Sequence, residues 1–249
     1  MIDLSSTDWV VAALSGLLLG FSKTGMPGAG ILAIPLMASI LPAKVSTGIV
    51  LPMLIMGDVV AVVWYRRHAV WSHLFRIIPF AVVGILIGFA IMGRITDRQL
   101  QPAIGGIIIV MLGLHVWRAR RPGMDEHLPT GLFFAGTMGL LAGVTTMLAN
   151  AAGPIMTIYL LAMRLPKTAF IGTGAWYFCL LNLFKVPFSM HLGLITPDTF
   201  AFNLRLLPFI LVGAAIGIVA ARRIPERTFG WAVQALAAAA ALRLLLTAV

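Results

Sequence analysis

The chain has 249 residues, of which 60% are hydrophobic and only 10% are charged, whereas an ordinary soluble domain is about 25% charged. This composition excludes a water-soluble globular protein, and long uncharged tracts from end to end indicate an all-α polytopic membrane protein. The formal net charge of +10 comes mostly from short loops between the apolar tracts. Basic residues in such loops indicate how a membrane protein is oriented and where it contacts anionic lipid. We therefore expect the lipid bilayer, and no nucleic acid, as a partner.

Hydrophobic tracts follow one another in a five-tract pattern that occurs twice. Their approximate bounds are 9–21, 29–41, 45–65, 74–93 and 100–118, then 130–144, 151–163, 168–190, 201–221 and 228–248. Corresponding residues recur at nearly constant spacing, since Gly30 matches Gly153 and Asp58 matches Asn182, 123 and 124 residues later. Such a pattern indicates a duplication. The expected organisation is a first transmembrane repeat at 1–120, a polar linker at 121–128 and a second transmembrane repeat at 129–249.

The two leading tracts of each half are too short to span a membrane. They contain about 13 residues each, against about 20 in the other three tracts, which suffice for a hydrocarbon core of roughly 30 Å. A Gly- and Pro-rich break separates the short tracts, at 22–30 in the first half and at 145–154 in the second. Irregular backbone at membrane depth is tolerated where it lines a cavity or is buried in protein. We therefore predict, in each half, a re-entrant helical hairpin or a broken helix, followed by three transmembrane helices.

The distribution of basic residues predicts how the two halves are oriented. Loop 66–76 contains Arg66, Arg67 and Arg76, whereas its counterpart 189–200 contains no Lys or Arg. Because basic loops stay in the cytoplasm, the equivalent loops are expected on opposite sides of the membrane. The prediction is a pair of inverted-topology repeats with both termini outside. A broken helix that counted as one crossing would instead give a parallel repeat, which the charge contrast disfavours.

The two breaks are the first candidates for a binding site, because inverted-repeat transporters bind substrate near the midplane, where broken helices meet. Both breaks offer hydroxyl and free backbone N–H donors without any acidic residue; the first adds an ammonium group and the second a side-chain amide. Donors and helix N-termini of this kind suit an anion. The candidate anion-binding residues are Ser22, Lys23, Thr24, Gly25, Gly28 and Gly30 in the first break and Thr145, Thr146, Asn150 and Gly153 in the second.

Each of these residues also has a purely structural interpretation. The glycines can serve only close helix packing. The two threonines of the second break can bond back to their own helix. Lys23 can extend its ammonium group to the membrane interface. The sequence leaves both kinds of interpretation open.

Charged residues inside full-length tracts are costly in a bilayer and are therefore informative. Asp58 lies in the middle of its tract, opposite the neutral counterpart Asn182, and Lys185 follows Asn182 by one helical turn, on about the same face. Asn182 and Lys185 are expected to complete the pocket. Asp58 is either the structural ion-pair partner of Lys185 or Lys23, or a group that couples or gates transport, in which role it could carry a proton.

The remaining polar and aromatic residues point to binding and not to bond breaking. Trp176, beside Tyr177, is a candidate for the cavity wall, with aromatic packing as the alternative. We expect no metal and no cofactor, because the 13 Met residues are scattered and no set of His, Cys or carboxylate residues has ligand spacing. No Ser/His pair and no pair of acids lies at tract depth, so we do not expect an enzyme.

Two segments carry a family resemblance. Residues 20–36 read GFSKTGMPGAGILAIPL, and a degenerate copy at 143–155 reads GVTTMLANAAGPI. This repeated glycine-rich break, in a chain of this length, resembles the TauE/SafE family of sulfite and organosulfonate transporters, also described as the four-toluene-sulfonate uptake permease group. The resemblance extends over nearly the whole chain. Many members have Gly in place of Ser22 and Lys23, so the additional cation indicates a more strongly anionic ligand.

The resemblance implies a multi-pass protein of the bacterial plasma (inner) membrane that transports small sulfur-containing anions such as sulfite, thiosulfate or C2 sulfonates such as sulfoacetate. Family members include exporters and importers, and we expect an exporter. Together with the donor-rich breaks, the resemblance predicts a secondary transporter that works by alternating access at a midplane site. Protons are a candidate coupling ion, and a homodimer is a candidate assembly. The alternatives are an anion channel or a carrier for small carboxylates.

Overall fold

The computed structural model of the chain describes residues 4–25, 29–119 and 130–220, and the secondary structure of these residues is entirely helical, with no strand among them. The predicted all-α fold class is therefore confirmed. The expected linker at 121–128 and the expected last tract at 228–248 lie outside the described residues. In chain order the elements are α1 (Ser6–Thr24), η1 (Ala29–Leu32), α2 (Ala33–Ile40), α3 (Ala43–Tyr65), η2 (Arg66–His68), α4 (Trp71–Met92), α5 (Asp97–Ala119), α6 (Leu132–Ala149), α7 (Gly153–Ala162), α8 (Lys167–His191) and α9 (Pro197–Ala220).

Helix length and apolar composition confirm a multi-pass membrane protein. Within the described residues, five helices are long and apolar enough to cross a bilayer: α3 together with η2, α4, α6, α8 and α9. Two apolar helices are short, at Gly30–Ile40 and Gly153–Ala162. These are the second short tracts that the sequence predicts in the two halves.

The leading helix of each half is longer than its hydrophobic tract. Helix α1 extends to Thr24 and α6 to Ala149, so the hydroxyl residues that the sequence analysis assigns to the irregular breaks lie in the last turns of helices. The reason is that a Thr hydroxyl can bond within a helix to the carbonyl four residues back, as Thr24 does to Gly20 at 3.3 Å and Thr145 to Leu141 at 2.8 Å. In the second half the irregular backbone is thereby confined to residues 150–152.

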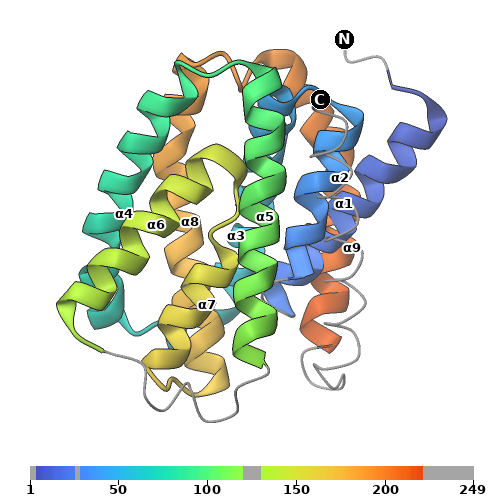
Figure 1. Cartoon of the computed structure of the whole chain (residues 1–249). Coiled ribbons are helices and arrows are strands. Elements are labelled where there is room, and N and C mark those ends of the chain that lie inside the picture. The colour runs from blue at the N-terminus through green and yellow to red at the C-terminus, as the bar shows by residue number, and fades with distance from the viewer. Residues whose placement is uncertain (1–3, 26–28, 120–129, 221–249) are drawn as a thin grey trace.

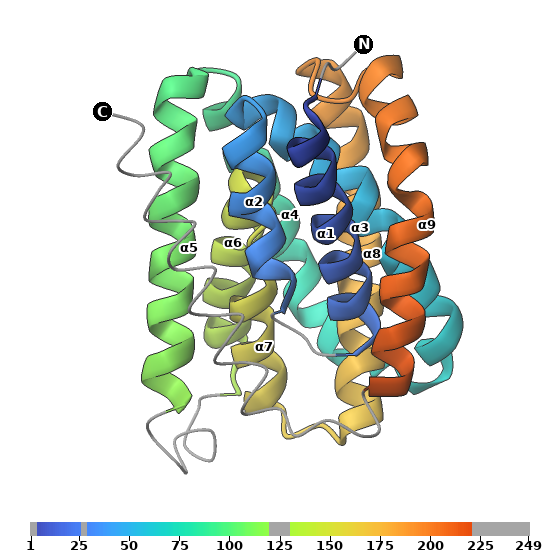
Figure 2. The ribbon, with the colours of Figure 1, turned by 90° about the vertical axis from the view of Figure 1, so that its right-hand side faces the viewer.

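Two helix pairs, α1 with α9 and α4 with α6, pack side by side through glycine (Figures 1 and 2). A Cβ atom at Gly20 would meet the backbone carbonyl of Ile210, and a Cβ atom at Gly143 would meet that of Ala81. Membrane helices associate in this way because lipid supplies little hydrophobic driving force between them. Their association then depends on close van der Waals contact. Each pair thus joins a leading helix of one half to a later helix of the other half.

Helices α3 and α8 form the central contact and run antiparallel. Gly48, near the start of α3, approaches the carbonyl of Leu194 just beyond the end of α8. Gly172, near the start of α8, approaches the carbonyl of Tyr65 at the end of α3. The middles of the two helices therefore meet, and they bring the buried Asp58 to the middle of α8.

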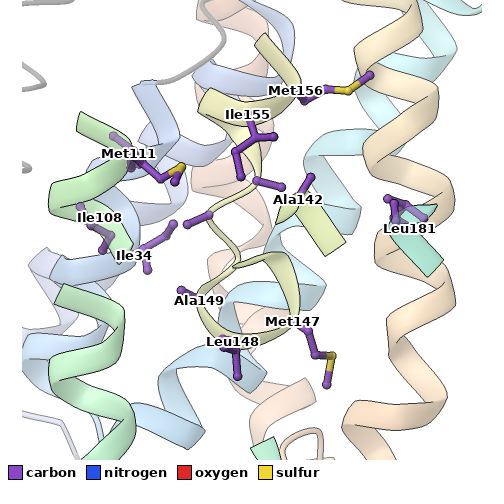
Figure 3. Packing of buried hydrophobic residues seen from close by; sticks show 14 of the residues in the cluster. Ile34, Ile108, Met111, Ala142, Met147, Leu148, Ala149, Ile155, Met156 and Leu181 are labelled. Carbon is purple, nitrogen blue, oxygen red and sulfur yellow. The ribbon is translucent and has the colours of Figure 1, made fainter. Parts of the chain in front are cut away.

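Buried apolar side chains hold the two short helices in place. Figure 3 shows Ile34 of α2 beside Ile108 and Met111 of α5, with Ile155 of α7 in the same cluster. A second apolar cluster joins α1, α2, α3 and α9; its buried members are Ala12, Leu19, Ala33, Met37, Leu41, Ile49, Val50, Met53, Leu54, Phe202, Leu206 and Ile210.

Candidate functional site

A cavity of about 90 Å³ lies where the two breaks meet, and we call it the central cavity. Its volume is several times the roughly 10–15 Å³ that one buried water requires, so it can hold a small oxyanion. Apolar side chains make up most of its wall. Its polar and glycine lining comes from both halves: Ser22, Lys23, Gly30, Thr146, Asn150, Gly153, Thr157, Gly174 and Asn182.

The second break is built by a left-handed residue followed by an uncapped helix start. Asn150 has φ 52° and ends α6, a conformation that Asn tolerates better than most residues. Helix α7 begins at Gly153 with no side-chain cap, and Pro154 follows. Because both residues line the cavity, the positive end of the α7 dipole faces it. A Cβ atom at Gly153 would meet nothing within 4 Å, so close packing does not explain this glycine.

The first break brings a hydroxyl and an ammonium group to the opposite wall. Ser22 and Lys23 lie in the last turn of α1, and Gly30 lies in η1, just before α2. A Cβ atom at Gly30 would lie 3.1 Å from the Ser22 Oγ, so the two sides of this break touch each other. The side chain of Lys23 is 11% exposed, and the residue lines the cavity.

An ion pair inside the bilayer fixes Lys23. Its Nζ lies 2.7 Å from Asp58 Oδ1, and the Asn182 Nδ2 donates a hydrogen bond of 2.7 Å to Asp58 Oδ2. The Lys23 Nζ also lies 4.2 Å from the centroid of the Phe178 ring, in a cation–π contact. Asp58 is fully buried. Of the two ion-pair partners that the sequence allows for Asp58, the structure places Lys23 against it.

The second buried cation, Lys185, lies behind the opposite wall. Its side chain is 1% exposed, and it does not line the cavity. The Nζ donates to Thr146 O at 2.9 Å, Thr146 Oγ1 at 3.0 Å and Asn150 Oδ1 at 2.7 Å. Asn150 in turn donates from Nδ2 to Thr47 O at 3.1 Å. Lys185 therefore supports two residues of the cavity wall from outside.

Two candidate residues near the end of α1 face away from the cavity and pack against α9. The Thr24 hydroxyl donates to Ala214 O at 2.7 Å. Gly25 lies so close to Gly217 that a Cβ atom would be 2.8 Å from its Cα. Successive residues of a helix are turned by about 100° around its axis. Thr24 therefore points toward α9, whereas Lys23 lines the cavity. Gly28 lies outside the described residues.

Two further candidates also lie away from the cavity. The Thr145 hydroxyl donates to Leu141 O at 2.8 Å, within its own helix. Trp176 donates from Nε1 to Arg66 O at 3.4 Å, and its ring lies 5.1 Å from that of Trp71. Both residues therefore serve helix and loop packing in this structure.

The cavity also has wall residues that the sequence analysis does not single out. Gly174 and Phe178 line it from α8, eight and four residues before the predicted Asn182, and Thr157 lines it from α7. A four-residue spacing places side chains on one helix face. That spacing, counted back from the polar Asn182, is the signal by which the sequence could have identified Phe178 and Gly174.

The site suits reversible binding of an anion. Its donors are an ammonium group, hydroxyls, a side-chain amide and the start of a helix, and the carboxylate beside it is already paired. Among the described residues, no group of three or more His, Cys, Asp or Glu could hold a metal ion. Mixed neutral and charged donors bind an oxyanion while leaving it free to dissociate.

Comparison with known proteins agrees with this chemistry. A family model described as "Sulfite exporter TauE/SafE" matches residues 12–244. No curated protein and no solved structure matches the chain. Because the family model covers nearly the whole chain, this membrane protein belongs to the TauE/SafE family of sulfite exporters.

Proposed function

We propose that the protein is a secondary transporter of the bacterial inner membrane that exports a small sulfur-containing anion, such as sulfite, thiosulfate or sulfoacetate. The observation that carries the proposal is the central cavity, which is lined by Lys23, Ser22, Thr146 and the start of α7. The anion would bind Lys23 and the wall donors. Asp58 would act as the internal counter-ion of Lys23 whenever the anion is absent. By competing for Lys23, it would gate the release of the anion.

Corresponding contacts in the two halves support a pair of inverted repeats. At the spacing of 123 residues Gly20 matches Gly143, and at a spacing of 129 residues Ala81 matches Ile210. Gly20 packs against Ile210, and Gly143 packs against Ala81, so both interfaces use matching residues.

The central helix pair supports the inverted orientation. Asp58 and Asn182 match each other at the spacing of 124 residues, and their side chains are hydrogen-bonded to one another. Matching residues that touch lie on the axis that relates two repeats. Because α3 and α8 are antiparallel, such an axis lies in the membrane plane, as in carriers that alternate access around a fixed site.

The shape of the cavity indicates which side it faces. Along α8 its lining runs from Asn182 back to Phe170, about 18 Å of helix at 1.5 Å per residue. The start of α8 lies beside η2, which contains Arg66 and Arg67. The cavity therefore extends toward the basic end of the molecule, which is expected to face the cytoplasm.

The matching region on the other side is closed by apolar packing. Val50 is the counterpart of Gly174, and Met37 is the counterpart of Leu160. Gly174 and Leu160 line the cavity, whereas Val50 and Met37 are buried in the second apolar cluster. Alternating access would open this cluster while closing the basic end.

Cysteine labelling tests this assignment of sides. In a background in which Cys179 is replaced by Ala, a cysteine at Gly174 should react with a membrane-impermeant maleimide added from the basic side. A cysteine at the matching position Val50 should react only from the opposite side, and more slowly, because the second apolar cluster covers it in this structure. Sealed vesicles of both orientations provide the measurement. Equal labelling of both cysteines from both sides would favour an open channel and contradict alternating access.

Counterflow in proteoliposomes tests the transport function itself. Labelled sulfite, thiosulfate and sulfoacetate are the probes, and chloride and acetate are the controls. We expect saturable exchange of at least one sulfur-containing anion, accelerated by the same anion on the opposite side. Exchange of acetate alone would identify a carboxylate carrier, and large conductance without acceleration would identify a channel.

A further inference from the structure

Lys185 is a buried lysine whose direct contacts are all neutral. Its Nζ is bonded to three neutral oxygens, two from Thr146 and one from Asn150. Asp58 is the buried carboxylate that could serve as its counter-ion, but both Asp58 oxygens are already bound, by Lys23 and by Asn182. Within the described residues, no ion pair of Lys185 with an acid is formed. A permanent ammonium group here would leave an uncompensated charge inside the bilayer, which is costly.

The three oxygens around Lys185 satisfy the amine in both protonation states. Thr146 O can only accept, and Asn150 Oδ1 accepts because the Nδ2 of the same side chain is directed to Thr47 O. The Thr146 hydroxyl can either accept or donate. An ammonium group donates to all three oxygens. A neutral amine donates to the two carbonyl oxygens and receives the hydroxyl proton of Thr146 on its lone pair, so no polar group is left unpaired.

The Thr146 hydroxyl therefore reports the protonation state of Lys185 to the cavity. When Lys185 is neutral, the hydroxyl proton of Thr146 points at the Nζ. When Lys185 is protonated, the oxygen accepts from the Nζ, and the hydroxyl proton is free to turn toward the cavity that Thr146 lines. In that orientation it can donate to an anion. Binding of the anion and binding of a proton to Lys185 thus favour each other.

We propose that Lys185 takes up a proton from water each time the anion binds in the central cavity, with the Thr146 hydroxyl as the coupling element. This inference rests on the proposed anion-binding function. It links anion binding to the uptake of one proton and places that proton on Lys185 and not on Asp58. The bound state then holds one added positive charge for the anion, and the empty site returns to the paired Lys23 and Asp58 with a neutral amine.

Other ionisable groups pack around this part of the molecule and must be separated from Lys185. Lys23 on α1 and Asp58 on α3 act on it electrostatically. The stretch of α6 that holds it contributes only Thr146 and Asn150 as polar contacts, and α4 packs against α8 here through Phe89 on Phe188.

Nearer the start of α8 the neighbouring groups are His73 of α4, Tyr159 of α7 and Arg66 of η2. The Tyr159 hydroxyl donates to His73 O at 3.1 Å, and the Arg66 carbonyl accepts from Trp176. Tyr177 and Cys179 lie on α8 itself. The alternative that matters most is protonation of Asp58 when the anion displaces it from Lys23.

Calorimetric titration of the purified full-length protein in lipid nanodiscs tests the proposal. Sulfite, thiosulfate and sulfoacetate are titrated at mildly alkaline pH, in two buffers of different ionisation enthalpy. The difference in heat gives the number of protons taken up, which we expect to be about one per anion. Binding without proton uptake would overturn the role of Lys185 while the proposed function stands. Binding of none of the three anions would overturn both.

Variants identify the proton-binding group. Thr146→Val removes the hydroxyl but not the carbonyl, and we expect it to abolish linked proton uptake and to weaken anion binding roughly tenfold, the loss of one charge-assisted hydrogen bond. Thr146→Ser restores the hydroxyl and should restore uptake. Thr145→Val is the matched control, because the Thr145 hydroxyl is bonded to Leu141 O and does not line the cavity. Proton uptake that persists in Thr146→Val and disappears in Asp58→Asn would assign the proton to Asp58 and overturn the proposal.

Discussion

Replacement of Lys23 by Met together with Asp58 by Asn is expected to give a folded protein that no longer transports. The double change removes both members of the buried ion pair, so no charge is left unpaired in the bilayer. The anion loses its charged ligand, however, and charge-assisted hydrogen bonds contribute about 1.5–3 kcal/mol each in proteins. We therefore expect affinity to fall by roughly tenfold to a hundredfold or more, and counterflow to fall to the level of empty liposomes.

The single variant Lys23→Met separates the structural from the functional role of the pair. It leaves the Asp58 carboxylate buried with only the Asn182 amide as a partner, and breaking one side of a buried pair costs about 3–5 kcal/mol. Thermal unfolding should therefore show a destabilised single variant and a largely rescued double variant. Neither should transport.

Lys44→Met is the matched control for these variants. Lys44 lies at the start of α3, outside the central cavity, and its backbone N–H, which a side-chain change does not remove, donates to Asp97. We expect wild-type counterflow from it. Wild-type counterflow in the Lys23→Met, Asp58→Asn protein would reject the anion-binding role of Lys23, because no other change in that protein could supply the lost charge.

Leucine at Gly20 or Gly143 is expected to prevent folding. At both positions a Cβ atom would overlap the backbone carbonyl of a neighbouring helix, Ile210 or Ala81. A backbone carbonyl cannot rotate away as a side chain can, so the helices must separate. Overpacking of a core costs about 1–3 kcal/mol when side chains can adjust, and the cost here should exceed that range. The expected result is loss of monodisperse protein in detergent and of a cooperative thermal transition.

Gly106→Ala is the control for these glycine variants. A Cβ atom at Gly106 would meet nothing within 4 Å, and Ala is the better helix former by about 1 kcal/mol. We expect this variant to be as stable as the wild type or slightly more stable. If Gly20→Leu and Gly143→Leu were as stable as Gly106→Ala, that result would contradict the close packing of α1 with α9 and of α4 with α6.

Helix boundaries show where sequence reasoning was limited. The hydrophobic tracts end before Ser22 and before Thr145, yet α1 and α6 continue through the polar residues that follow. Hydropathy reports how well a residue tolerates lipid, whereas helix continuation depends on backbone hydrogen bonds, which Ser, Thr and Lys do not interrupt. Helix α6 ends only at Asn150, where the backbone turns left-handed.

The composition of the site could be predicted from the sequence, but its membership only in part. Glycine-rich breaks without acids pointed to an anion site, and Ser22, Lys23, Thr146 and Asn150 do line one cavity. Thr24 and Thr145, each adjacent to a lining residue, are turned into helix interfaces instead. Sequence shows which donors are present in a segment, but a rotation of about 100° per residue decides which of them reach the cavity.

The membrane class, the helical fold and the family could be predicted from the amino-acid sequence, because each depends on local composition or on a contiguous motif. The packing of the helices was needed to establish that Lys23 pairs with Asp58, that Lys185 is held by Thr146 and Asn150, and that the leading helix of each half packs on the other half. These contacts join residues from different helices of a bilayer protein. Such contacts depend on shape complementarity and on hydrogen bonds to buried polar groups, and neither property can be deduced from a single segment of sequence.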